Sequence, residues 1–349
     1  MKLKSFALTK IKKNKEGYYI LDRIKNNLVY NIAKKNNVIL PRFDKDIIYE
    51  AVKDADVVHI LIPLFIARKT SKFVKSLGIP ITSSFHAQAQ NFTAQFHILK
   101  CKIGEKHTYK MYYNNLYKYA DAVHYPTQFI RDIFETSVKK KTNGYVISNG
   151  VNDMFKPIQV EKKNEFKDKF CILFTGRLSR EKSHKVLIKA VNKSKYKDKI
   201  QLFFAGDGPT KKDIIKYSKK HLSNEPIIDF YSREELLKLI NSCDLYCHPA
   251  YAEIEAISCL EAISCGLVPL IANSPCCATK KFAIDNRCLF KVNDSRDLAK
   301  KIDYFIEHPE CIKELREKYL LESTSFNQTK CMEQMEQMLI ETAKLKKKD

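Results

Sequence analysis

Short apolar segments alternate with segments of helical periodicity along most of this chain, and this alternation constrains the fold more than any other feature. The apolar run 57–63 predicts a strand and residues 66–77 predict a helix, after which the turn Gly78-Ile79-Pro80 leads into a strand predicted over 81–85. Strands that alternate with helices are typical of a parallel sheet with helices on both faces. We therefore predict an α/β protein, and the length of 349 residues suggests two domains.

The charge is strongly positive and unevenly distributed. The net charge is +22, and residues 1–150 hold 26 Lys and Arg against 11 Asp and Glu, whereas residues 151–349 hold 36 against 29. A surplus in one half predicts that this half meets an anionic surface, such as lipid headgroups or nucleic acid. The alternative is a composition rich in Lys, Asn and Ile throughout. Because no recognised nucleic-acid-binding motif occurs, no nucleic-acid partner is expected.

The cysteines and the apolar runs bear on the compartment. The eleven cysteines lack C-x-x-C spacing, and all except Cys101 follow residue 170 in or beside apolar runs. They predict reduced, buried thiols rather than a zinc site or a disulfide scaffold. The chain has no apolar run of about 18 residues and no signal-peptide core at its N-terminus. We expect a cytoplasmic protein that can associate peripherally with the inner face of a membrane.

The most informative motif is residues 244–269, DLYCHPAYAEIEAISCLEAISCGLVP. A short strand and a tight turn lead into a helical run that ends at Gly266. Glu253 and Glu261 are eight residues apart, about two helical turns, so we expect both on one helix. The backbone N–H groups of 255–257 would lie at the start of this helix, where phosphate binds readily. The alternative is an amphipathic helix with two solvated acids.

Two further segments carry groups suited to the same ligand. The predicted strand 170–176 precedes Arg177 and Lys182, whose positive charges can neutralise a diphosphate. In the segment VISNGVNDMFKP, Gly150 follows a strand and allows the backbone to approach a ligand closely. A solvated basic pair and an ordinary tight turn are the alternatives.

Histidines and tyrosines mark the first half of the chain. His86 directly follows the strand predicted over 81–85, at the edge where ligands of open α/β sheets bind. The alternative is a histidine bonded to a loop carbonyl. His59 and His124 also end strands and are expected to be structural. Residues 97–119 mix five tyrosines with lysines, which suits a membrane surface or single-stranded nucleic acid, or else a helix that packs its aromatic face on the sheet.

Taken in order, these segments resemble the donor-sugar motifs of retaining nucleotide-sugar glycosyltransferases of the family-four group (group 1 glycosyl transferases). The resemblance covers roughly residues 46–330. It implies the GT-B fold, with two facing Rossmann-like domains and parallel sheets. Residues 1–157 would form the acceptor-side domain and 158–329 the domain that binds the nucleotide sugar. The last helix, 330–349, would cross back to the first domain.

The resemblance also implies a role for each motif residue. Glu253 would bind hydroxyls of the donor sugar, Glu261 would bind the ribose, and His86 would help to position the sugar and the acceptor. The residues that contact the rest of the donor would be Gly150, Arg177, Lys182, Glu255, Ala256 and Ile257. The family usually has Phe-Gly where this chain has Glu255-Ala256. No metal ion or other cofactor is expected.

The expected reaction is transfer of a hexose from a nucleotide sugar, most simply a UDP-sugar, to a lipid-linked or cell-surface glycan or glycolipid. The start of the chain departs from the family. It has no Gly-Gly, and its only glycine before Gly78 is Gly17. We therefore predict that the first strand of the first domain and its Gly-rich loop are missing. This loss suggests an alternative function, a degenerate member of the fold that binds a nucleotide sugar or a lipid without turnover.

Overall fold

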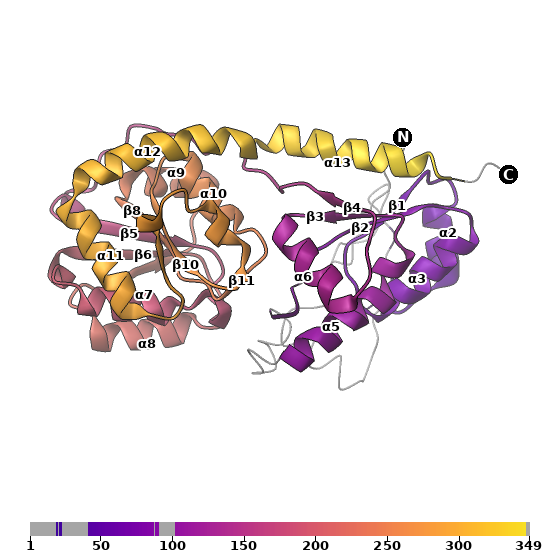
Figure 1. Cartoon of the computed structure of the whole chain (residues 1–349), viewed down its shortest axis with the longest axis horizontal. Coiled ribbons are helices and arrows are strands. Elements are labelled where there is room, and N and C mark those ends of the chain that lie inside the picture. Colours follow the sequence, from indigo (N-terminus) through magenta and orange to yellow (C-terminus); the bar gives the residue numbers. More distant parts are fainter. Residues whose placement is uncertain (1–18, 20, 23–40, 87, 91–101, 347–349) are drawn as a thin grey trace. The chain divides into compact units, whose positions relative to one another are not determined.

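The chain divides into two units (Figure 1). The computed structural model describes residues 19, 21, 22, 41–86, 88–90 and 102–346. Of these, the first unit holds the residues up to Ile147 and those from Gln334 onward, and the second unit holds Ser148–Glu333. Val151 and Phe155 are buried in the core of the second unit. The segment 148–157 therefore packs with the second unit, although the sequence placed it in the first.

Within its described residues, the first unit has a parallel sheet of four strands that follow chain order, β1-β2-β3-β4. Its strands are β1 (Val58–Ile60), β2 (Ile81–Ser84), β3 (Ala122–Tyr125) and β4 (Gly144–Val146). Its helices are α2 (Lys45–Val52), α3 (Phe65–Ser76), α5 (Lys102–Asn115) and α6 (Gln128–Val138). The parallel α/β architecture predicted from the alternation is confirmed. The predicted loss of the first strand and its loop concerns residues before 41, nearly all of which lie outside the described residues.

The tyrosine-rich run contributes to the core of the first unit. Phe85, which follows β2, lies 5.0 Å from Tyr117 and 4.8 Å from Phe134 between ring centroids. Tyr109 and Tyr112 on α5 are buried as well. Because these rings pack against one another, the interpretation of the tyrosines as a membrane or nucleic-acid surface is wrong. The alternative, a helix with its aromatic face on the sheet, is confirmed.

The second unit has a six-stranded parallel sheet in the order β12-β10-β8-β5-β6-β7. Its strands are β5 (Phe170–Thr175), β6 (Ile200–Ala205), β7 (Ile227–Asp229), β8 (Leu245–His248), β10 (Pro269–Asn273) and β12 (Leu289–Lys291). The chain starts at β5, moves outward through β6 to β7, and then returns to β8 on the other side of β5. This is the strand order of doubly wound nucleotide-binding folds, in which ligands bind at the carboxyl ends of the two strands where the winding reverses. Those strands are β5 and β8.

Helices cover both faces of this sheet. They are α7 (His184–Lys193), α8 (Lys211–His221), α9 (Arg233–Ser242), α10 (Ile257–Ser264), α11 (Ser295–Glu307) and α12 (Pro309–Ser323). Figure 1 shows α7, α8 and α11 on one side of the sheet and α9, α10 and α12 on the other. The last helix, α13 (Gln328–Ala343), starts in the second unit and from Gln334 onward packs in the first.

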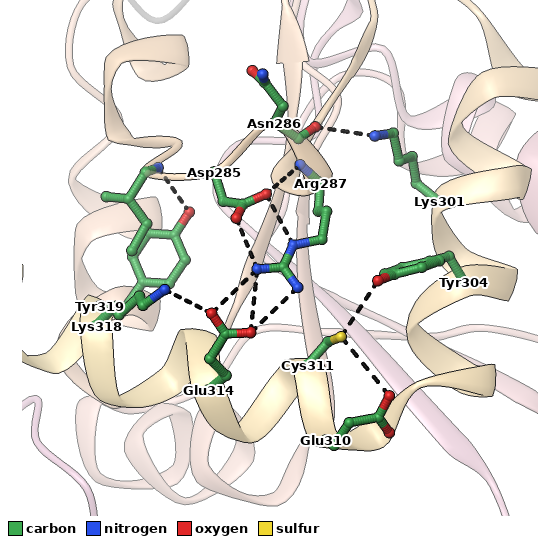
Figure 2. Close-up of polar contacts among 11 residues, drawn as sticks. Asp285, Asn286, Arg287, Lys301, Tyr304, Glu310, Cys311, Glu314, Lys318 and Tyr319 are labelled. Atoms are coloured by element: carbon green, nitrogen blue, oxygen red, sulfur yellow. Dashed lines mark hydrogen bonds and ion pairs between the residues drawn. The ribbon is translucent and has the colours of Figure 1, made fainter.

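A polar cluster fastens the turn before β12 to α12 (Figure 2). The guanidinium of Arg287 lies 2.8 Å from a carboxylate oxygen of Asp285 and 3.3 Å from one of Glu314, and Lys318 pairs with Glu314 at 2.6 Å. The hydrogen bonds from Arg287 hold the pKa of Asp285 at about 2. These groups satisfy one another, so we assign the cluster to structure rather than to ligand binding.

The described cysteines are all free, and most are buried. Burial raises the pKa of Cys171 to about 11 and that of Cys288 to about 11, which keeps both thiols protonated at neutral pH. The prediction of reduced, buried thiols is confirmed for most of the described cysteines, whereas Cys243, Cys276 and Cys311 are partly exposed and Cys101 lies outside the described residues. Across the same residues, no helix is both long enough and apolar enough to span a bilayer.

Candidate functional site

A buried ion pair stands at the carboxyl edge of β5 and β8. Lys182 ends a short 3-10 turn after β5, and Glu253 ends β9 (Ala252–Glu253), which follows β8. The ammonium group of Lys182 donates a hydrogen bond to a carboxylate oxygen of Glu253. The two side chains are only 15% and 14% exposed, so their attraction is weakly screened by water. The structure thus brings together one of the two predicted acids and one of the two predicted cations.

The prediction that Glu253 and Glu261 share a helix is wrong. Glu253 lies on β9, which pairs in parallel with β11 (Cys276–Cys277) and places Glu253 opposite Cys277. The helix α10 starts only at Ile257, because the residue before it has a left-handed backbone. Glu261 lies on α10. The strand β9 depends on a partner far along the chain, so local spacing could not reveal it.

Ala256 occupies a position that favours glycine. Its φ is 66° and its side chain is 7% exposed. A non-glycine residue in this region has a steric penalty of roughly 1–2 kcal/mol. This position is the one where the related family usually has glycine, which supports the alignment of the motif.

The start of α10 offers backbone donors. The N–H groups of Cys259 and Leu260 bond to the carbonyl of Ala256, at 2.9 and 3.3 Å. The N–H groups of Ile257 and Ser258 make no hydrogen bond to any described residue. Free N–H groups at the positive end of a helix dipole are suited to an anionic ligand. The predicted phosphate site therefore keeps Ile257 and extends to Ser258.

The carboxylate of Glu255 accepts hydrogen bonds from other residues of the second unit. One oxygen accepts a 2.5 Å hydrogen bond from the hydroxyl of Ser148, and the other accepts a 2.5 Å bond from the side-chain amide of Asn149. The Glu255 side chain is 3% exposed, and this burial raises its pKa. The residue thus anchors the segment 148–149 beside α10. A contact of Glu255 with the donor, as predicted, would have to come from its backbone.

Gly150 is required for packing. Its φ is 73°, and a Cβ atom added there would lie 2.6 Å from the Cα atom of Gln328 at the start of α13. The close approach that the sequence predicted for a ligand is made by this helix. A donor contact of Gly150 stays a prediction.

Arg177 projects from the loop after β5. Its side chain is exposed and forms no ion pair with any described residue. The loop is held by two backbone hydrogen bonds to the loop after β6, from Leu178 N to Asp207 O at 2.9 Å and from Thr210 N to Leu178 O at 3.0 Å. Arg177 is therefore a free cation on a fixed loop, at the same sheet edge as Lys182.

His248 belongs to this edge but was missed in the sequence. It is the last residue of β8 and is fully buried. Its Nε2 atom lies 3.7 Å from a carboxylate oxygen of Glu253, too far for a hydrogen bond, and has no other partner among the described residues. Burial, aided by the charge of Lys182, holds its pKa well below the usual value, so the ring is neutral. The sequence could have indicated this residue, because His248 stands at the end of an apolar strand segment, and ligands bind at the ends of such strands.

Glu261 predicts a pH dependence of stability. Burial raises its pKa to about 7, partly opposed by Arg233. Between the unfolded pKa and about 7, the unfolded chain releases this proton first, so stability falls as pH rises. We expect a loss of about 2–3 kcal/mol in the free energy of unfolding between about pH 4.5 and pH 7 from this residue. Glu261→Gln, which cannot ionise, should flatten the profile, as measured by urea unfolding at several pH values. Equal slopes for both proteins would contradict the prediction.

His86 lies in the first unit, just after β2. Its ring is exposed and stands 5.8 Å from that of His124, between centroids. Behind it, Ser84 Oγ is 3.1 Å from His59 Nε2 and 3.0 Å from His124 Nδ1, while His124 Nε2 is 2.7 Å from the carbonyl of Ile147. Burial lowers the pKa of both inner histidines to about 4. The prediction that His59 and His124 are structural is confirmed, and the catalytic role of His86 stays a prediction.

Comparisons with known proteins agree on the kind of domain. Residues 155–320 match the family model of "Glycosyl transferases group 1". The chain is 22% identical over 231 residues to the alpha-monoglucosyldiacylglycerol synthase of Streptococcus pneumoniae, a match that covers 62% of this chain and 52% of that protein. It spans about half the length of the first curated relatives it matches.

Two solved structures are also similar. The Anabaena protein HepE, solved in complex with UDP-glucose, has a TM-score of 0.70 and 14% identity, over 93% of this chain and 92% of that chain. The catalytic domain of a cholesterol-alpha-glucosyltransferase from Helicobacter pylori is 44% identical, over 45% of this chain and 99% of that chain, with a TM-score of 0.44. The likeness to HepE shows the fold. The family match assigns residues 155–320, most of the second unit, to the group 1 glycosyl transferases, in a chain with the GT-B fold.

Proposed function

We propose that this chain is a retaining glycosyltransferase that moves a hexose from a UDP-sugar to a lipid-linked or glycan acceptor. The observation that carries the proposal is the buried Lys182–Glu253 pair at the carboxyl edge of β5 and β8. It stands in a domain of the group 1 family, at the position where doubly wound folds bind nucleotides. Such a pair offers a cation for phosphate and a carboxylate for sugar hydroxyls.

Each group at this edge has a part in the proposed reaction. Glu253 accepts hydrogen bonds from hydroxyls of the donor sugar, and Glu261 accepts one from the ribose. The diphosphate binds Lys182, Arg177 and the free N–H groups at the start of α10. As the bond between the anomeric carbon and the diphosphate breaks, these groups stabilise the charge that develops on the leaving oxygen. The acceptor hydroxyl attacks from the same face and passes its proton to that oxygen. His86 helps to position the reacting groups. The proposed reaction uses no metal ion.

Two relatives support the choice of substrates. HepE was solved with UDP-glucose, which supports a UDP-linked donor. The pneumococcal relative is named for a glucosylated diacylglycerol product, which supports a lipid acceptor. The positive balance of the first half of the chain fits an acceptor presented among anionic lipids.

A donor panel followed by a transfer assay tests the proposal. We expect UDP-hexoses to raise the melting temperature more than GDP- or ADP-sugars, since a ligand at 100 times its Kd stabilises the folded state by about 2.7 kcal/mol. UDP release should then increase when vesicles that contain diacylglycerol are added, and NMR of the product should show the anomeric configuration of the donor.

The alternative outcomes are informative. No thermal shift with any nucleotide sugar would contradict the proposal. A shift without UDP release, across both lipid and glycan acceptors, would instead support the non-catalytic binder. A product with the opposite anomeric configuration would reject the retaining mechanism alone.

A further inference from the structure

We infer that the first unit carries a membrane-docking surface, formed by the apolar segment 61–65 and by the cationic face of α3. The partner that fits it is an anionic lipid bilayer. The inference deepens the proposed function and rests on it for its purpose, because an enzyme with a lipid-linked acceptor must reach that acceptor at a membrane.

The apolar part consists of three side chains that follow β1. Leu61 and Ile62 are each 52% exposed and Phe65 is 63% exposed. Large apolar side chains that are exposed together often mark an interaction site, whereas single exposed apolar side chains are common on any protein surface. The segment is anchored, because Leu64 N donates to Ile62 O at 2.9 Å and the amide of Asn115 lies 3.5 Å from the carbonyl of Pro63. These side chains are thus presented on a defined backbone.

The cationic part continues along α3. Phe65 is followed at spacings of three, four and seven residues by Arg68, Lys69 and Lys72, so the four side chains lie on one helical face. All four are exposed, whereas the buried residues Ala67, Ser71 and Val74 face the other way. The helix contains no Asp or Glu.

The charge of this face is not neutralised by the described part of the chain. Lys75, one turn further along the same side of α3, pairs with Asp121 at 2.5 Å. In contrast, Arg68, Lys69 and Lys72 form no ion pair with any described residue. Three unpaired cations next to three exposed apolar side chains match the two layers of a bilayer surface, with headgroup phosphates outside and acyl chains below.

The position of the surface fits an acceptor drawn from that bilayer. Residues 61–64 directly follow β1, and His86 lies two residues after the end of β2, the neighbouring parallel strand. Both therefore lie at the carboxyl edge of the same sheet, where ligands of parallel sheets bind. A nucleic acid would satisfy the cations but would leave the exposed aliphatic side chains without a partner.

Vesicle sedimentation with the full chain tests the inference. The probes are phosphatidylcholine vesicles with and without phosphatidylglycerol, at low and high salt. We expect the wild type to bind the anionic vesicles at low salt and to lose binding at high salt, because salt screens the cations. The triple variant Arg68→Gln, Lys69→Gln, Lys72→Gln should bind at least about tenfold more weakly. The triple variant Leu61→Ser, Ile62→Ser, Phe65→Ser should weaken binding by a similar factor.

A matched control removes the same charge elsewhere. Lys212, Lys216 and Lys220 are exposed on α8, and none of them forms an ion pair with a described residue. Their joint replacement by Gln should change vesicle binding less than about twofold. The inference is overturned if both surface variants bind like the wild type, or if the control loses as much as they do. It is also overturned if the chain binds single-stranded RNA but no vesicle.

The donor thermal shift, measured on the same variants, separates this inference from the proposed function. Surface variants that lose vesicle binding but keep the donor shift support both. Vesicle binding that depends on these residues, in a chain that no nucleotide sugar stabilises, supports the docking surface and rejects the proposed donor.

Discussion

Lys182→Ala should abolish sugar transfer and also lower the stability of the second unit. The loss of a cation that stabilises the leaving diphosphate is expected to reduce turnover by about a hundredfold or more. In addition, the variant leaves the carboxylate of Glu253 buried without its partner, since this side chain is only 14% exposed. Breaking a buried ion pair on one side typically destabilises a protein by about 3–5 kcal/mol.

A double replacement separates the two effects. Lys182→Met together with Glu253→Gln removes both charges and keeps the side chains close to their original sizes. We expect this variant to recover most of the free energy of unfolding in urea, because a neutral pair has no unpaired charge. UDP release should stay at the level of Lys182→Ala. Wild-type turnover in either variant would remove the pair from the mechanism.

A surface pair provides the control. Lys195 and Glu307 are 3.1 Å apart, and the lysine side chain is 72% exposed. Exposed pairs of this kind contribute little to stability, because water and salt screen the attraction between the charges. Lys195→Ala should therefore change neither turnover nor stability appreciably, which would assign the loss in Lys182→Ala to the buried pair and not to the removal of a positive charge in general.

Gly206→Ala should prevent the second unit from folding normally. A Cβ atom at this position would lie 2.0 Å from the carbonyl oxygen of Gly176, a backbone atom that cannot rotate away. The φ of 155° is also unfavourable for alanine. The loops after β5 and β6 would have to separate, and Arg177 would move with them. We expect the free energy of unfolding to fall by more than about 4 kcal/mol, as measured by urea or thermal unfolding.

Gly176→Ala isolates the steric part of this effect. Gly176 also has a positive φ, 131°, but the nearest atom to an added Cβ is 3.7 Å away. In this variant only backbone strain remains, so we expect the free energy of unfolding to fall by roughly 1–2 kcal/mol. If the two variants were equally stable, the close approach of the two loops would not be the reason for glycine at 206.

The parts of the fold that depend on local pattern were predictable. The strand predicted over 81–85 matches β2, and the helix predicted over 66–77 matches α3. The helix α3 has one buried and one exposed face, so its periodicity is visible within its own residues, whereas β2 is a short strand that is buried throughout. Arg177 and Lys182 follow β5, a strand that was predictable because its residues form a short apolar run.

The parts that depend on distant partners were not predictable. β9 exists because residues 276–277 pair with it, and that pairing takes Glu253 out of the helix of Glu261. The carboxylate of Glu255 meets Ser148 and Asn149, more than a hundred residues earlier in the chain. Sequence spacing carries no information about such contacts. The tyrosine-rich run was ambiguous for a related reason, because burial of its rings depends on Phe85 and Phe134.

The attachment of Val151 has a mechanical consequence. Val151 N donates to Phe326 O at 2.7 Å, and Gln328 N donates to Val151 O at 3.1 Å, so the outgoing and the returning chain are bonded to each other within the second unit. Just before this bridge, Glu255 binds Ser148 and Asn149. These hydrogen bonds fasten the first and the last segment of the second unit to each other. Because Glu255 directly precedes the turn into α10, the start of that helix is linked through Ser148 and Asn149 to the segment that opens the second unit.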